Sequence, residues 1–198
     1  MSKDESRLSR GVAPAKGSTE PSRVAAPPLD VEERELVLAA QRGDVLAMSL
    51  LLDRLAPWVA RICGGIALEQ ADDAAQEALV QVFRDLRTLR EPAALRGWAR
   101  RITVREAVRH AQRARSGAAH ASDGAIEDIG SELRDPALAP DVRAVLALLA
   151  PEQRAILVLR DLEGLSEEEA AEELGVAKGT VKSRLSRARE AFAKRWDS

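Results

Sequence analysis

The chain has 198 residues, 45% of them hydrophobic and 31% charged, which is enough for one domain or two small domains with packed cores. Its single cysteine, Cys63, excludes an intrachain disulfide and gives no support to a cysteine-based zinc site. The longest apolar run, residues 144–150, is too short to span a bilayer, and no secretory signal is evident. We therefore expect a cytoplasmic protein without membrane insertion.

The apolar residues are mainly Ala, Leu and Val, and only 3% of the chain is aromatic, which favours helices over sheets. The net charge of −2 alone argues against a nucleic-acid-binding protein. The charges are strongly segregated along the chain, however, and local patches decide binding more than the total does. We therefore predict an all-α protein and look for local patches of charge.

The N-terminal part divides into an extension and a first helical domain. Residues 1–30 are rich in Ser, Pro, Ala and Gly without an apolar period, which predicts a disordered extension. Residues 31–115 are helical in pattern throughout. Gly43-Asp44 is expected to separate two helices, and Gly64-Gly65 to end the second of them.

Two further helices complete this first domain. One is predicted from Ala71 to about Leu86, and a turn follows at Glu91-Pro92 because the residue before proline avoids helical geometry. A long helix then runs over 94–115. Residues 116–140 turn to Gly, Ser, Ala, Asp and Pro and predict a flexible linker to a second helical domain at 141–198.

The most informative segment is 165–189, where two short helical patterns flank a glycine turn. Ser166 and Glu169 form a capping-box pattern at the start of an acidic helix, and Gly175 suits the left-handed residue at its end. The second helix is expected to begin at Gly179 or Thr180, and its buried stripe is formed by Val181, Leu185, Ala188 and Phe192.

The second helix is basic, with seven Lys or Arg and one acid over 177–196. A helix-turn-helix that binds DNA places such a helix in the major groove, where short and basic side chains reach phosphates and base edges. An ordinary helical hairpin with a solvated basic face is the alternative. The residues that we expect to face DNA are Lys178, Thr180, Lys182, Ser183, Ser186 and Arg187.

The long helix of the first domain carries a run of arginines, with four at strict four-residue steps from Arg101 through Arg105 and Arg109 to Arg113. Together with Arg96, Arg100 and Arg115 they are expected to form one basic ridge, anchored by apolar side chains such as Trp98. Such a ridge can follow a phosphate backbone, although a charge run is usually only a solvated face. The helix-turn-helix downstream favours the DNA-binding interpretation.

The helix predicted at 71–86 has a polar face formed by Asp72, Asp73, Gln76 and Glu77. Paired carboxylates can serve a metal or acid–base catalysis, but no His, Cys or further acid cluster completes such a site, and no phosphate-binding loop is present. A solvated face and a docking surface for a basic partner both remain open. We expect neither enzymatic activity nor a metal or cofactor.

These three elements, in this order, resemble bacterial sigma factors of the extracytoplasmic-function (ECF) type in the sigma-70 family. The resemblance covers about 32–113 and 141–196. Its most specific stretches are Leu149-Ala-Pro-Glu-Gln-Arg154, Leu162-Glu-Gly-Leu-Ser166 and Gly179-Thr-Val-Lys-Ser-Arg184. It implies a region 2 bundle, which binds core RNA polymerase and opens the −10 promoter element, and a region 4 helix-turn-helix, which reads the −35 element.

The resemblance implies roles for single residues. The second helix of the helix-turn-helix would face the −35 element, and the 71–86 helix would dock on the clamp helices of the polymerase β′ subunit. The β subunit, promoter DNA and an anti-sigma factor are the further partners that it implies. The residues placed near the −10 strand are Leu89, Trp98, Arg101, Arg105 and Arg109.

This chain departs from the family pattern at two −10 positions. It has Leu89 where the family commonly has Phe, and Arg105 where Asn is usual. Stacking of an aromatic ring on a base is lost at Leu89, although the plane of an arginine can substitute in part. The favoured function is a transcription initiation factor. The alternative is a free-standing helix-turn-helix regulator that does not bind polymerase.

Overall fold

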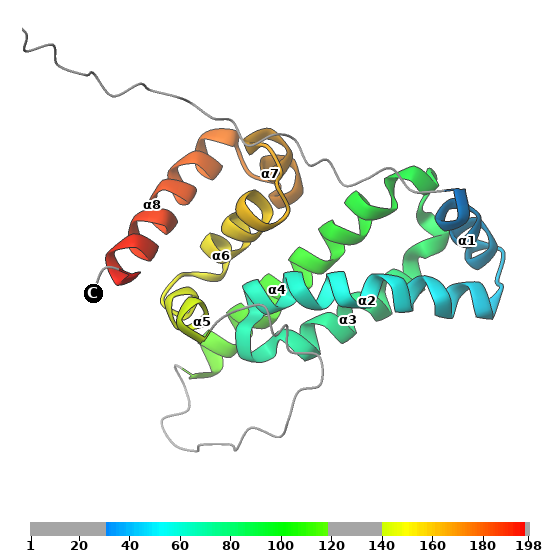
Figure 1. Ribbon diagram of the computed structural model, residues 1–198, viewed down its shortest axis with the longest axis horizontal. Coiled ribbons are helices and arrows are strands. Elements are labelled where there is room, and N and C mark those ends of the chain that lie inside the picture. Colours follow the sequence, from blue (N-terminus) through cyan, green and yellow to red (C-terminus); the bar gives the residue numbers. More distant parts are fainter. Residues whose placement is uncertain (1–30, 119–139, 197–198) are drawn as a thin grey trace, which may run out of the picture.

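The computed structural model describes residues 31–118 and 140–196, and every regular element in these two ranges is helical (Figure 1). The all-α fold class is confirmed. The predicted extension at 1–30 and the linker residues 119–139 lie outside the described residues. The predicted linker start is wrong by three residues, because the last helix of the first domain continues to Ala118.

The N-terminal domain is a bundle of one short helix and three long ones, in which α2 packs on α1, α3 and α4. Leu51, Leu55, Ile62, Val82 and Leu95 are fully buried between these helices. A turn at 42–44 joins α1 to α2, and short 3-10 segments join α2 to α3 and α3 to α4. The elements are α1 (Val31–Gln41), α2 (Val45–Ala67), η1 (Leu68–Gln70), α3 (Ala71–Asp85), η2 (Leu86–Thr88), η3 (Pro92–Ala94) and α4 (Leu95–Ala118).

The start of α2 agrees with the sequence, and its end does not. Asp44 caps the helix by accepting a hydrogen bond from the Ala47 amide at 3.0 Å, so the predicted break at Gly43-Asp44 is confirmed. Gly64-Gly65 does not end the helix, which runs through both buried glycines to Ala67. Tertiary contact at Gly65 outweighs the low helix propensity of glycine at this point.

The C-terminal domain consists of α5 (Pro140–Ala147), α6 (Pro151–Leu157), the π-helical segment η4 (Val158–Leu162), α7 (Glu167–Leu174) and α8 (Lys178–Trp196). Pro151 stands in the first turn of α6, as predicted, where its missing N–H costs no hydrogen bond. The helices α6 and α7 both pack on α8, and Ala155, Ile156, Leu159, Val181 and Leu185 form the centre of the domain.

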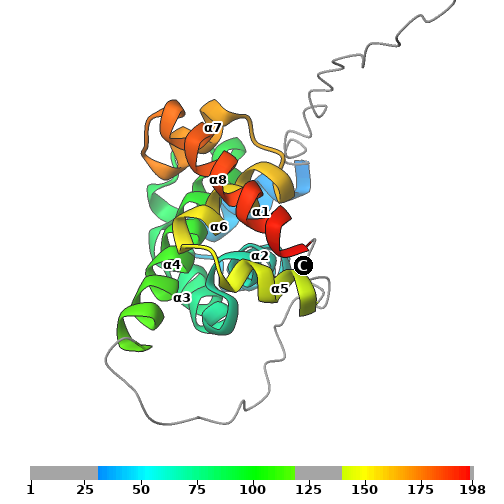
Figure 2. The ribbon, with the colours of Figure 1, turned by 90° about the vertical axis from the view of Figure 1, so that its left-hand side faces the viewer.

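The two domains lie against each other, which the sequence did not predict. Contacts join α6 to both α2 and α4, and α7 to α4. Figure 1 shows the C-terminal helices standing along one side of the α2–α4 bundle, and the view in Figure 2 shows α6 between α8 and that bundle. One continuous core therefore includes Ile62 and Ile66 of α2 together with Ile156 and Leu159.

Candidate nucleic-acid and polymerase interface

The helix-turn-helix is built by local hydrogen bonds that its sequence specifies. Ser166 Oγ accepts from the Glu169 amide at 3.2 Å, and Glu169 Oε2 accepts from the Ser166 amide at 2.7 Å. This reciprocal cap confirms the predicted capping box and starts α7. Gly175 ends α7 in the left-handed conformation, with φ 62° and ψ 34°, as predicted. Both ends of α7 are therefore defined by local interactions, and the turn at Gly175 sets the direction in which α8 begins.

The helix α8 begins at Lys178, one or two residues earlier than expected. It has a buried inner face and an exposed outer face. Val181, Leu185 and Ala188 are buried, while Phe192 is only half-buried. The opposite face is formed by the residues predicted to bind DNA. Of these, Thr180 is half-buried, and the exposed ones are Lys178, Lys182, Ser183, Ser186 and Arg187.

Some of these side chains already have partners within the domain. Lys178 Nζ pairs with Glu168 of α7, and this contact raises the pKa of the lysine. Ser183 Oγ donates to the Thr180 carbonyl at 3.1 Å. Within the described ranges, Lys182 and Arg187 make no ion pair, so both charges are available in the first three turns of α8.

The predicted arginine ridge on α4 is not one continuous surface. Arg101 and Arg105 have side chains 60% and 62% exposed, and Arg109 is half-buried beside them. Arg96 turns away to the α1–α2 side, where it bonds Glu33 at 2.9 Å and lies over the Trp58 ring. Five residues separate Arg96 from Arg101, which is about 140° around a helix of 3.6 residues per turn.

A buried carboxylate holds the middle of the ridge. Glu106 is 6% exposed and pairs with Arg105, at 3.5 Å, and with Arg109. A buried charge of this kind is retained only with close partners. Glu106 therefore fixes where two of the three predicted −10 arginines lie.

The other two predicted −10 residues are less accessible. Leu89 is 7% exposed and belongs to the core, and Gln41 Nε2 donates to its carbonyl at 2.7 Å. In this conformation the Leu89 side chain cannot contact a DNA base, because it is packed in the apolar core. Trp98 is half-buried against the same core.

The predicted docking face lies on α3. Ala74, Ala75 and Ala78 are buried on its inner side, so the acidic residues point outward as the sequence indicated. Asp73 and Gln76 are exposed, and Asp72 and Glu77 are half-buried. Glu77 Oε1 lies 3.9 Å from Arg109 Nη2, which places the edge of the acidic face directly beside the basic ridge.

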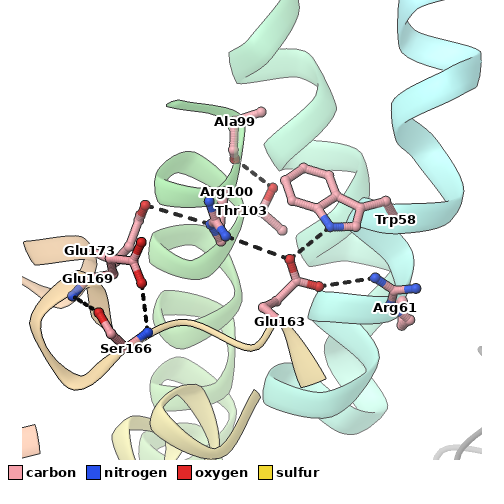
Figure 3. Close-up of polar contacts among 9 residues, drawn as sticks. All are labelled: Trp58, Arg61, Ala99, Arg100, Thr103, Glu163, Ser166, Glu169 and Glu173. Atoms are coloured by element: carbon pink, nitrogen blue, oxygen red, sulfur yellow. Dashed lines mark hydrogen bonds and ion pairs between the residues drawn. The ribbon is translucent and has the colours of Figure 1, made fainter. Parts of the chain in front are cut away.

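The contact between the domains contains a charged cluster that the sequence did not reveal. Glu163, directly after η4, accepts from Trp58 Nε1 at 3.0 Å and from Arg61 Nη2 at 3.1 Å (Figure 3). It also lies 3.9 Å from Arg100, and its side chain is only 7% exposed. The stretch around Glu163 was recognisable as a family motif, but no spacing linked it to α2 or α4.

A second carboxylate, Glu173 of α7, completes this cluster. It lies 3.6 Å from Arg100 Nε and 3.8 Å from Arg101 Nε. Its side chain is 8% exposed, and burial raises the pKa of its carboxyl despite both arginines. The loss of hydration therefore destabilises the charged form of this carboxylate more than the two arginines stabilise it. We name Glu163, Glu173 and their partners Trp58, Arg61, Arg100 and Arg101 the interdomain cluster.

Other chemistry finds little support in the described part of the chain. No group of three or more His, Cys, Asp or Glu is placed there to hold a metal ion. None of the described helices is long and apolar enough to cross a membrane. Cys63 is buried, and burial raises the pKa of its thiol to about 12, so it remains a packing residue.

Comparison with known families places both domains. Residues 51–117 match the family described as "Sigma-70 region 2", and residues 140–192 match "Sigma-70, region 4". The first match covers most of the α2–α4 bundle, and the second covers the C-terminal domain except for the last four described residues of α8. The helix-turn-helix therefore lies within the region 4 match, and the ridge and acidic face lie within the region 2 match.

Curated relatives agree. The chain is 35% identical to the ECF RNA polymerase sigma factor SigM of Mycobacterium tuberculosis, over 82% of this chain and 83% of the relative. It is 32% identical to the ECF sigma-E factor of Escherichia coli over 81% and 92% of the two chains. It also matches SigE of Mycolicibacterium smegmatis at 39% identity, but spans only 49% of that protein.

A solved structure shows the same fold. The structure of CnrH with the cytosolic domain of CnrY matches with a TM-score of 0.57 at 23% identity, over 83% of this chain and 97% of the other. With two sigma-70 regions in order, and relatives aligned over most of both chains, this chain belongs to the ECF RNA polymerase sigma factors of the sigma-70 family.

Proposed function

We propose that this initiation factor divides its work among three faces. The outer face of α8, centred on Lys182 and Arg187, binds the −35 element. The α4 ridge, with Arg101 and Arg105, lies along the −10 strand. The α3 face, with Glu77, docks on the β′ clamp helices of core RNA polymerase, so the protein acts in the cytoplasm, where polymerase is found.

The observation that carries this proposal is the separation of inner and outer faces on α8. The helix buries Val181, Leu185 and Ala188 in its own domain, and among residues 31–118 and 140–196 no carboxylate pairs with Lys182 or Arg187 on the basic, short-side-chained face. A helix whose inner face is packed in the domain and whose outer face is positively charged can contact phosphates and base edges.

The adjacency of Glu77 and Arg109 supports the assignments on region 2. A partner that binds the acidic face of α3 comes to lie next to the ridge, so polymerase docking would bring the −10 strand to Arg105 and Arg109. Leu89 is not part of this proposal because it is buried.

The test is transcription reconstituted from purified core RNA polymerase and a library of genomic promoter fragments. The expected result is initiation from a small set of promoters that share −35 and −10 sequences. Lack of any initiation above that of core enzyme, in a protein that is folded and binds core enzyme, would contradict the proposal. Tight operator binding by the free protein, without polymerase binding, would favour the independent regulator instead.

A further inference from the structure

Arg105 differs from the other two arginines proposed for the −10 strand in how its guanidinium is held. Arg101 belongs to the interdomain cluster, where its Nε lies 3.8 Å from Glu173. Arg109 is half-buried, and its Nη2 pairs with Glu106. Arg105 also pairs with Glu106, its one ion partner among the described residues, yet its side chain is 62% exposed. Its guanidinium is therefore held at one point and otherwise faces solvent.

The carboxylate that holds Arg105 comes from inside the bundle. The Glu106 side chain is 7% exposed, and its charge adds to the effect of burial in raising the pKa of the Cys63 thiol to about 12. The carboxylate therefore lies on the side of α4 that faces α2. A buried charge needs close partners of opposite sign, and the described residues that supply them are Arg105 and Arg109. Glu106 consequently draws both side chains toward the helix.

This contact leaves the outer edge of the Arg105 guanidinium open. Successive residues of a helix point about 100° apart, so Arg105 bends back over α4 to reach its neighbour. The ion pair joins its Nε to Glu106 Oε1 at 3.5 Å. Within the described ranges, the Nη1 and Nη2 atoms of Arg105 donate no hydrogen bond. These two atoms are parallel donors, with which arginine binds a pair of acceptors in one plane.

Two parallel donors fit one base better than the others. Guanine presents O6 and N7, both acceptors, side by side on its major-groove edge, and arginine on this pair is the commonest specific contact between a side chain and a base. Adenine presents a donor and an acceptor there, which suits an amide side chain instead. Because Glu106 already restricts Arg105, less side-chain freedom is lost when the guanidinium binds a base.

We propose that Arg105 binds a guanine of the −10 strand through its Nη1 and Nη2 atoms, and that Glu106 is the positioning residue that holds Arg105 for this contact. The inference rests on the proposed function, in which the α4 ridge lies along that strand. Without Glu106, Arg105 and Arg109 would be like charges one helical turn apart, and their repulsion would separate them. The buried carboxylate therefore decides which donors of Arg105 face the strand.

The test of the base uses holoenzyme assembled from core RNA polymerase and the full chain. The template is a promoter from the genomic library with its −10 positions randomised, and transcripts are counted through a barcode downstream of the start site. Wild type should prefer guanine over adenine at one −10 position by about 5- to 150-fold, the discrimination of a good bidentate pair. Arg105→Gln should lose this preference or shift it to adenine, because glutamine matches the adenine edge.

Arg113→Gln is the matched control for this substitution. It makes the same change at an exposed position of the ridge, eight residues or about 12 Å further along α4. It should keep the guanine preference, and any loss of transcription should be shared equally by all sequences.

A modified base tests the contact atom by atom. A synthetic promoter carries 7-deazaguanine, which lacks the N7 acceptor, at the preferred position of the nontemplate strand. Open-complex formation by the wild-type holoenzyme should fall at least about threefold, the effect of losing one hydrogen bond to a charged donor. The holoenzyme with Arg105→Gln should not distinguish 7-deazaguanine from guanine.

The role of Glu106 is measured by the ratio of guanine to adenine at the same position. Glu106→Ala should lower this ratio at least about threefold, because the held orientation of Arg105 is lost. Glu106→Gln should restore part of it, because the amide oxygen can still accept from Arg105 Nε. A residue that only supports the fold would lower transcription from every sequence by one factor and leave the ratio unchanged.

The outcomes separate this inference from the proposed function. A holoenzyme that initiates specifically, but whose base preferences are the same with Arg105→Gln, would overturn the guanine contact and leave the function standing. An equal response of wild type and Arg105→Gln to 7-deazaguanine would do the same. An unchanged ratio in Glu106→Ala would overturn the positioning role, and Glu106→Gln decides this point if the alanine variant does not fold. Initiation at no promoter would reject the function and the inference together.

Discussion

The left-handed turn between α7 and α8 gives a stability prediction whose sign depends only on backbone conformation. Gly175 has φ 62°, and a Cβ atom added to it meets nothing within 4 Å. Gly179, in the first turn of α8, is equally open, and its φ is not in the left-handed region. The two glycines therefore differ in conformation and not in the space around them.

Gly175→Ala should destabilise the protein by about 1–2 kcal/mol, the cost of placing an L-residue with a Cβ in the left-handed region. In a protein of this size, such a loss lowers Tm by roughly 2–8 °C. Gly179→Ala should leave stability unchanged or raise it by up to about 1 kcal/mol, because alanine is the better helix former. Gly175→Asn should fall between wild type and Gly175→Ala, since asparagine tolerates this conformation.

The assay is thermal unfolding of the three full-length variants, followed by circular dichroism at one protein concentration and salt. Because the two domains share a core, the comparison uses Tm shifts against wild type. Equal Tm values for Gly175→Ala and Gly179→Ala would refute the reasoning. The space around the two glycines is the same, so a cost of the left-handed conformation at Gly175 should appear as a difference between the two Tm values.

Three further predictions concern the proposed faces and the core. Arg187→Ala should cost about 1–3 kcal/mol in promoter binding with relaxed specificity at one −35 position, measured by competition among promoter variants; a loss uniform across sequences would make it a phosphate contact. Glu77→Arg should weaken core polymerase binding in a pull-down while leaving −35 binding by the full chain intact, and equal loss of both would contradict the division of labour. Because burial raises the pKa of Cys63 to about 12, the thiol stays protonated at pH 8 and should resist iodoacetamide until urea unfolds the domain; rapid native alkylation would show that α2 opens readily.

The sequence predicted local features well, because each depends on neighbouring residues. The Ser166–Glu169 cap, the left-handed Gly175 and the buried stripe of α8 all follow from periodicity and capping chemistry within about twenty residues. The family motifs fixed the domain types in the same way. What these signals share is that no distant contact is needed to interpret them.

The errors occur where a contact comes from far along the chain. Gly64-Gly65 looked like a helix end because its reason, the approach of Val158, lies more than ninety residues away. The ridge looked continuous because nothing in its spacing showed that Arg96 would turn to Glu33 and Trp58. Leu89 was assigned by family position, and only packing shows that it is buried.

The π-helical segment η4 has a consequence for how this protein can vary. A π turn holds one residue more than the α turn that it replaces, and such turns are often found at functional positions. In this chain the extra residue falls between α6 and Glu163, so it sets the rotation at which that carboxylate meets Trp58 and Arg61. Loss of a single residue from 158–162 would remove the residue that the wider turn accommodates and would change the path by which the chain reaches Glu163. The length of this short segment, as well as the identity of its side chains, therefore decides whether Glu163 reaches Trp58 and Arg61 of α2.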